Sequence, residues 1–143
     1  MQQNINDPLK ELDFQGVYRL QKNGTLTLLT KKLSRPNGIA FSPDFTKIYV
    51  ANSDPTKAIW MVYELAENGL HENGKVFFDA TDKVKKMKGL PDGMKVHPEG
   101  YIFATGPGGV LIFTPDAKHL GTVFTGEATA NCAFNEDFSM LYI

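Results

Sequence analysis

The chain has 143 residues, a length suited to one domain, and its 13 glycines, 8 prolines and 11% aromatic residues fit many short strands separated by tight turns. Its 15 basic and 16 acidic side chains give a net charge of −1, so no long-range field favours nucleic acid or an anionic membrane, and neither partner is expected. The single cysteine, Cys132, excludes an intramolecular disulfide and a Cys-rich zinc site, and we expect it to be a small buried hydrophobe.

The N-terminal residues 1–13 are polar and contain the turn signal Asn6-Asp7-Pro8, so we expect a loop that leads into the fold. They lack a charged segment followed by an apolar core, and no apolar run of about 18 residues occurs anywhere. We therefore expect a soluble chain without a signal peptide. The sequence does not distinguish between the cytoplasm and the periplasm as its compartment.

Short strand patterns separated by turn signals follow along the rest of the chain. Residues 16–20 and 25–30 flank the hairpin signal Asn23-Gly24. The strands expected after this hairpin are residues 39–41, 47–51, 59–65, 75–79, 94–96, 101–105, 110–114, 122–125, 132–134 and 140–143. Residues 81–88 form a helix-compatible basic run, which we expect to be a solvated connection.

One pattern, a polar entry followed by strand, turn and strand, occurs three times, in residues 35–52, 90–105 and 130–143. Internal repeats at roughly 40 to 50 residues indicate a propeller or a solenoid, and an antiparallel run of four strands is the unit of a propeller blade. With blade strands labelled A to D from the inside outward, the order along the chain is CD-ABCD-ABCD-AB. The sequence thus predicts an all-β fold made of β-propeller blades.

We expect a single partial β-propeller domain over residues 1–143. After the lead-in loop of residues 1–13, its successive blade segments are residues 14–30, 36–79, 90–125 and 130–143. Both end blades are incomplete in this order, and unpaired half-blades leave backbone donors and acceptors without partners. The chain is therefore predicted to be a piece of a ring.

Alignment of the repeats on Phe41, Val96 and Phe134 places Asn37 and Asp92 at the same position, just before an innermost strand. Equivalent positions in adjacent blades converge on the propeller axis, so both side-chain oxygens should enter one central cavity. Such oxygen ligands suit Ca²⁺, and Mg²⁺ less well. The alternative is that Pro-Asn-Gly and Pro-Asp-Gly serve only turn geometry.

Asn131 does not keep this offset, because the alignment places Ala130 opposite Asn37; Asn131 is a candidate for lining the same cavity. His71, His97 and His119 all fall in expected turns or loops, and we expect all three to face solvent. Their spacing does not suggest a metal pair.

Four stretches resemble consecutive motifs of the gluconolactonase and regucalcin (senescence marker protein) family, over the C-terminal half of such a protein. They are KELDFQGVYRL at residues 10–20, RPNGIAFSPD at 35–44, LPDGM at 90–94 and NCAF at 131–134. The resemblance implies half of a six-bladed propeller, with a divalent cation, usually Ca²⁺, held at the axis by a Glu, two Asn and an Asp. By motif, Asn37 matches the second of these Asn and Asp92 matches the Asp, whereas the Glu and the first Asn belong to blades that this sequence does not contain.

The resemblance further implies a metal-dependent hydrolase of sugar lactones. The cation, Ca²⁺ or another divalent ion, would act as a Lewis acid, and Asp92 would be both ligand and general base. Two alternatives stay open: a non-catalytic half-propeller or binding module, and a phosphotriesterase-type hydrolase of the same fold.

The strand order also suggests an assembly. Two copies would close a six-bladed ring, with the AB strands of one completing the CD strands of the other about a twofold axis. A homodimer is therefore a candidate partner arrangement, besides the lactone as small-molecule substrate.

Overall fold

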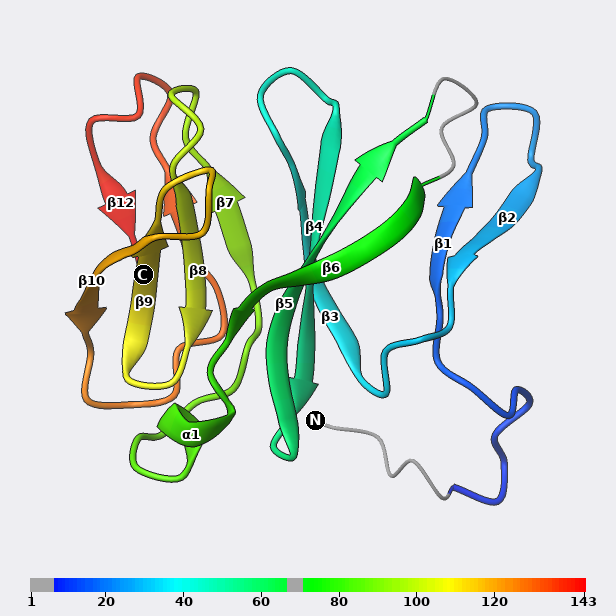
Figure 1. Cartoon of the computed structure of the whole chain (residues 1–143), viewed down its shortest axis with the longest axis horizontal. Helices are drawn as coiled ribbons and strands as arrows, with labels where there is room; N and C mark the ends of the chain where they lie inside the picture. The colour runs from blue at the N-terminus through cyan, green and yellow to red at the C-terminus, as the bar shows by residue number, and fades with distance from the viewer. Residues whose placement is uncertain (1–6, 67–70) are drawn as a thin grey trace.

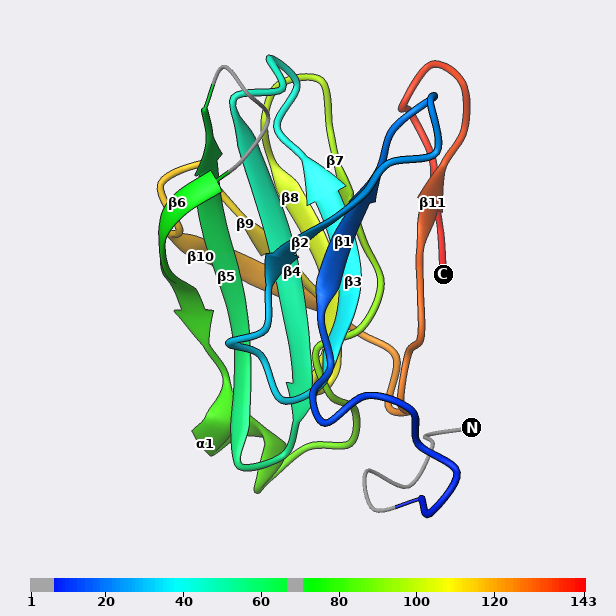
Figure 2. The ribbon, with the colours of Figure 1, turned by 90° about the vertical axis from the view of Figure 1, so that its right-hand side faces the viewer.

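The computed structural model describes residues 7–66 and 71–143, without the side chains of residues 71–73, as antiparallel sheets standing side by side (Figure 1). The first sheet pairs β1 (Val17–Leu20) with β2 (Leu26–Thr30). The second contains β3 (Pro36–Phe41), β4 (Lys47–Asp54), β5 (Lys57–Leu65) and β6 (His71–Asp79), which lie in this order across the sheet (Figure 2).

The short helix α1 (Thr81–Val84) connects the second sheet to the third. The third sheet contains β7 (Met94–Val96), β8 (Ile102–Gly106), β9 (Gly109–Phe113) and β10 (His119–Phe124), again in chain order across the sheet. The last sheet pairs β11 (Ala133–Phe134) with β12 (Leu141–Tyr142).

These sheets of two, four, four and two strands confirm the predicted order CD-ABCD-ABCD-AB. The chain is half of a six-bladed propeller, with two complete blades between two half-blades. In the repeats, Phe41 pairs with Ile48, Val96 with Ile102, and Phe134 with Leu141. The same anchor position is therefore paired in all three inner hairpins, with a turn that is one residue shorter between β7 and β8.

The larger of two core clusters lies between the two complete blades, and a second one joins Val17 of β1 to β4 and β5. In β4, residues 48–53 are all buried, because both faces of this strand are covered by neighbouring structure. Trp60, Phe113 and Tyr49 are at most 2% exposed and belong to one cluster with the side chains of β8 and β9. Burial of large aromatic side chains is the main stabilising contribution in such a core.

Several element boundaries differ from the sequence prediction. The structure places Asn73 and Gly74 inside β6, although we expected this strand to begin only at residue 75. A Cβ atom on Gly74 would lie 1.9 Å from Cε1 of Tyr63, so the glycine allows close approach of a ring from β5. The predicted helical run is shorter than expected, since α1 ends at Val84.

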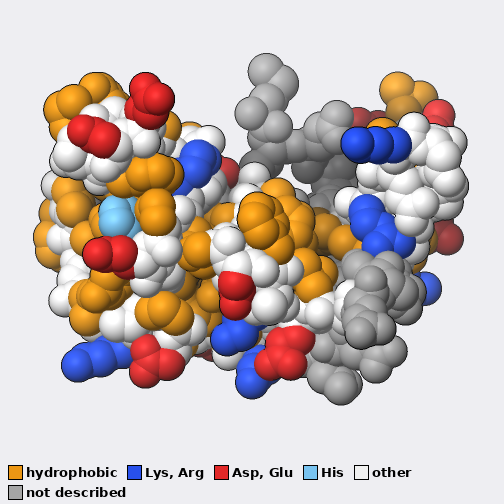
Figure 3. Space-filling view, turned by 90° about the horizontal axis from the view of Figure 1, so that it is seen from above, with side chains coloured by type: hydrophobic (Ala, Val, Ile, Leu, Met, Phe, Trp, Pro, Cys, Tyr) orange, Lys and Arg blue, Asp and Glu red, His pale blue; other side chains and the backbone are white. Residues whose placement is uncertain are grey.

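The two half-blades expose large apolar side chains. Leu20 and Leu26 in the first sheet are 71% and 63% exposed, and Tyr142 in the last is 58% exposed. Seen from above, hydrophobic side chains also reach the surface (Figure 3). Phe45, in the turn between β3 and β4, is one of the exposed large apolar residues. The half-blades thus have the surfaces of an unfinished ring.

Candidate active site at the inner strands

Asn37 and Asp92 lie next to each other, Asn37 in the inner strand β3 and Asp92 two residues before the inner strand β7. A Cβ atom on Gly38 would lie 2.0 Å from the backbone oxygen of Asp92, so only glycine permits this contact between blades. Gly38 lies within β3 and not in a turn, which argues against the interpretation of Pro-Asn-Gly as turn geometry alone. The close contact brings the Asn37 side chain beside the Asp92 carboxylate.

The electrostatics of Asp92 are set mainly by its half-buried position. Burial raises the pKa of this carboxyl, while hydrogen bonds from the Asn37 side chain and the Gly93 backbone act in the opposite direction. A carboxylate whose pKa is shifted towards neutral is a better general base near pH 7 than an ordinary aspartate. Asp92 thus has an environment that suits acid–base chemistry.

Asn52, which is fully buried in β4, holds the beginning of β3 in place. Its Oδ1 atom accepts a hydrogen bond from the backbone N–H of Arg35 at 2.8 Å, and its Nδ2 group donates to the Lys57 carbonyl at 2.8 Å. The Ser53 N–H also donates to the Arg35 carbonyl at 2.8 Å. These bonds fix the segment that leads directly into Asn37.

Thr105, also fully buried, does the same for Asp92 from β8. Its carbonyl accepts the N–H of Asp92 at 3.0 Å, and its own N–H donates to the Gly93 carbonyl at 2.9 Å. Its hydroxyl donates to the carbonyls of Gly93, at 2.9 Å, and Ala130, at 3.1 Å, so one proton is shared between two blades. Our sequence analysis missed both Asn52 and Thr105. The pattern that could have revealed them is a polar residue directly after a short apolar run in the second strand of each blade.

Asn131 lies at the contact between Gly93 and the last half-blade. A Cβ atom on Gly93 would lie 2.3 Å from Oδ1 of Asn131 and 2.8 Å from the carbonyl of Ala130. The Ala130 carbonyl therefore meets Gly93 as the Asp92 carbonyl meets Gly38. This repeated contact agrees with the sequence alignment that put Ala130, rather than Asn131, opposite Asn37.

The donor set at this site fits a hard cation in part. The amide oxygen of Asn37 and the carboxylate of Asp92 are ligands of the kind that Ca²⁺ prefers, but Ca²⁺ takes about six to eight oxygens. Within residues 7–66 and 71–143, no group of three or more His, Cys, Asp or Glu side chains is arranged to hold a metal. These two side chains alone therefore fall short of the donors that Ca²⁺ requires.

Two of the histidine predictions are wrong. His119 lies in β10 and packs on the rings of Phe78 and Phe113, with centroid distances of 5.7 and 5.3 Å, and its burial lowers its pKa. His97 is in a turn but is half-buried, because its ring packs on Phe134 and Phe138. Both rings fill gaps beside aromatic neighbours, which strand and turn patterns did not reveal; the side chain of His71 lies outside the described residues.

Cys132 is buried, as predicted. Its thiol lies 3.7 Å from the Phe103 carbonyl, and burial raises its pKa. A buried thiol with a raised pKa is a poor nucleophile at neutral pH. Cys132 thus serves packing.

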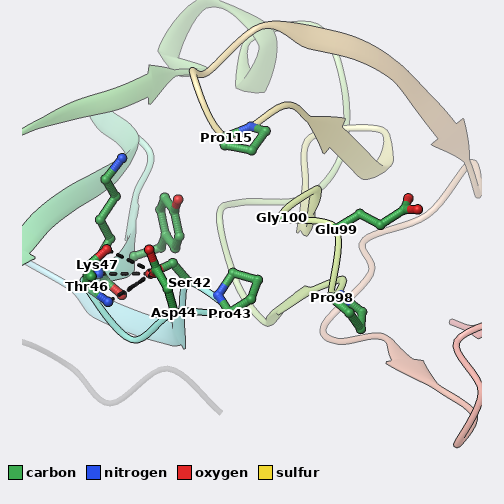
Figure 4. Close-up of a pocket in the computed structure, with 10 residues that line it drawn as sticks. Ser42, Pro43, Asp44, Thr46, Lys47, Pro98, Glu99, Gly100 and Pro115 are labelled. Atoms are coloured by element: carbon green, nitrogen blue, oxygen red, sulfur yellow. Dashed lines mark hydrogen bonds between the residues drawn. The ribbon is translucent and has the colours of Figure 1, made fainter.

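A pocket of about 280 Å³ lies at the opposite end of the blades, among the turns after β3, β7 and β9 (Figure 4). Asp44 lines it, but its carboxylate accepts hydrogen bonds from the Ser42 hydroxyl and from the N–H and hydroxyl of Thr46, which lower its pKa to about 2. This carboxylate stabilises its turn. Neither Asn37 nor Asp92 lines this pocket, so it is separate from the candidate active site.

The fold and the site define a propeller half with an Asn and an Asp side chain together at its inner strands, and comparison with known proteins identifies the family. The family model described as the SMP-30/gluconolactonase/LRE-like region matches residues 1–143. The chain belongs to this family.

Among curated relatives, a gluconolactonase of Zymomonas mobilis is 42% identical over 144 residues, covering 94% of this chain and 39% of the relative. A pentonolactonase of Haloferax volcanii is 28% identical, covering 89% of this chain and 43% of the relative. The chain thus spans about 40% of the length of these relatives.

Solved structures give the same result. A gluconolactonase from Xanthomonas campestris superposes with a TM-score of 0.79 at 29% identity, covering 92% of this chain and 42% of that protein. A regucalcin from Agrobacterium tumefaciens, described as a calcium-binding protein, superposes with a TM-score of 0.69 at 31% identity, covering 83% of this chain and 40% of that protein. Within the described residues, no helix is both long and apolar enough to span a membrane.

Proposed function

We propose that this chain carries part of the active site of a hydrolase that opens sugar lactones. The observation that supports this most directly is the contact between Asn37 and Asp92 at the inner strands, in a chain 42% identical to a gluconolactonase. The relatives include a gluconolactonase and a pentonolactonase, and this favours lactones over the phosphotriesters that the fold alone would permit.

In this reaction, water adds to the lactone carbonyl carbon and the bond from that carbon to the ring oxygen breaks. Asp92 accepts a proton from the attacking water, and the proton is passed to the ring oxygen, which becomes a hydroxyl group. The new carboxylic acid ionises near pH 7 and releases one proton to solvent. The Asn37 amide lies beside Asp92 and orients this carboxylate.

We further propose that the site binds a divalent cation, with Ca²⁺ as the first candidate. Asn37 and Asp92 would hold it through their side-chain oxygens, and the cation would polarise the lactone carbonyl as a Lewis acid. The regucalcin that resembles this chain is described as calcium-binding, which supports this choice of ion.

The remaining half of the ring must come from elsewhere. One candidate source is a second copy, whose β1 would pair with β12 of the first, so that two Asn37 and two Asp92 side chains surround one axis. The exposed apolar side chains of both half-blades support such closure. The other source is three further blades of a longer polypeptide, as the greater length of the relatives suggests.

The test is proton release from glucono-δ-lactone in a pH-stat, corrected for spontaneous opening. We expect Asp92→Asn to lower the rate about 100-fold or more, since it removes the base. The matched control is Asp44→Asn, an acidic residue in the turn at the other end of β3, which should keep the rate. Two results would contradict the proposal: equal rates for Asp92→Asn and the unsubstituted chain, or no hydrolysis by folded chain that has closed into a ring. Either result would favour a non-catalytic binding module.

A further inference from the structure

Lys95 extends from β7 towards the last half-blade, three residues after Asp92. Its Nζ atom donates hydrogen bonds to Oδ1 of Asn131 and to the Met94 carbonyl, both at 3.2 Å. Strand alternation turns Lys95 to the β11 side of β7, whereas Asp92 meets Asn37 on the β3 side. The inner strand thus carries an acid on one side and a cation on the other.

The positive charge of Lys95 is not neutralised within the part of the chain that the structure describes. The lysine ion pairs there join Lys85 to Asp82 and Lys88 to Glu127. Lys95 is half-buried and contacts only neutral oxygens. A partly buried cation without a counter-ion favours an anionic ligand.

The orientation of Asn131 is fixed by its neighbours. Its Oδ1 atom accepts from the Cys132 N–H at 2.9 Å as well as from Lys95, and both groups can only donate. The oxygen therefore cannot be exchanged with Nδ2 without loss of both bonds. Asn131 is exposed, so the group it offers to a ligand is the Nδ2 donor.

We propose that Lys95 and the Nδ2 group of Asn131 form a subsite for the carboxylate of a sugar acid, the product of lactone opening. An ammonium beside an amide donor can bind the two oxygens of one carboxylate, and Gly93 joins this pair to Asp92 through the backbone. This inference rests on the proposed function. It assigns Asn131 as a donor to an anion rather than as an oxygen ligand.

The test is a titration of the folded chain with sodium gluconate, followed by NMR chemical shifts of backbone and Asn side-chain amides. We expect shifts at Asn131 and its neighbours, and an affinity at least about fivefold lower in Lys95→Gln, with Lys95→Arg retaining most of it. The matched control is Lys47→Gln, a half-buried lysine at the opposite end of the blades, which should bind as the unsubstituted chain does. Sorbitol, which has no carboxylate, should cause no such shifts.

A second variant guards against misfolding of Lys95→Gln. In Asn131→Asp, a carboxylate can still accept from the Cys132 N–H and from Lys95, but it neutralises the cation, so gluconate binding should be lost. Gluconate binding that Lys95→Gln and Asn131→Asp leave unchanged overturns the subsite, as does a folded chain that gluconate does not perturb. Lactone opening measured on the same samples separates the two proposals. If the chain hydrolyses the lactone but binds gluconate equally well without Lys95, only the subsite is refuted. If gluconate binding depends on Lys95 but the lactone is not hydrolysed, only the reaction is refuted.

Discussion

The two complete blades and the two half-blades are built from the same repeat but differ sharply in burial. Trp60 and Phe113 in the complete blades are 1% and 0% exposed, whereas Leu20 in the first half-blade is 71% exposed. The repeat supplies apolar side chains everywhere, but only the complete blades have neighbours on both faces.

This difference separates the complete blades, which contain the candidate active-site residues, from the half-blades at the two ends of the chain. Asn37 and Asp92 both belong to complete blades, and buried Asn52 and Thr105 hold them from the second strand of each blade. The site's own residues are therefore placed by the stable part of the chain. The half-blades carry the strand edges at which we propose that the ring is completed.

The largest expected effect comes from the core between the complete blades. Trp60→Ala should lower the free energy of unfolding by about 3–5 kcal/mol, because it leaves a cavity beside Gly106 and Phe113. Leu20→Ala in the half-blade should cost within about 0.5 kcal/mol in the open chain. Urea denaturation followed by circular dichroism measures both. Similar losses in the two variants would contradict the proposed division between complete and incomplete blades.

A smaller effect is expected at the link between the second complete blade and the last half-blade. Thr105→Val keeps the shape of the side chain but removes the hydroxyl that donates to Gly93 and Ala130, at a cost of about 1–2 kcal/mol. The same urea titration measures it, with Thr25→Val in the exposed β1–β2 turn as control. If the two valine variants were equally stable, the hydroxyl would not hold the blades together.

The smallest effect concerns acid stability at the end of β4. Hydrogen bonds from the hydroxyls of Ser34 and Thr56 lower the pKa of Asp54 from 3.8 to about 2. Because its pKa is lower in the folded state, Asp54 stabilises the fold above pH 3.8, and this contribution is lost as the pH falls to about 2. Asp54→Asn should flatten the decline of thermal midpoint over this range. A decline as steep as in the unsubstituted chain would show that other groups cause it.

The repeat predicted the fold well because blade strands follow one another locally, so turn signals and alternation suffice to order them. The same register brought Asn37 and Asp92 to notice. Lys95 and Thr105 were not found, because each contacts a residue of the next blade segment that lies far along the chain, Asn131 for Lys95 and Ala130 for Thr105. His119 was misplaced for a related reason: its ring is buried by Phe78 of the preceding blade, which no local pattern encodes.

A Ca²⁺ titration of the chain, followed by NMR, tests the candidate site most directly. If Asn37 and Asp92 bind a cation, Ca²⁺ should shift the side-chain amide of Asn37 and the backbone amides of Asp92 and Gly93, and Asp92→Asn should abolish these shifts while Asp44→Asn keeps them. Shifts confined to the turn around Asp44, or shifts at Asn37 that persist in Asp92→Asn, would contradict it.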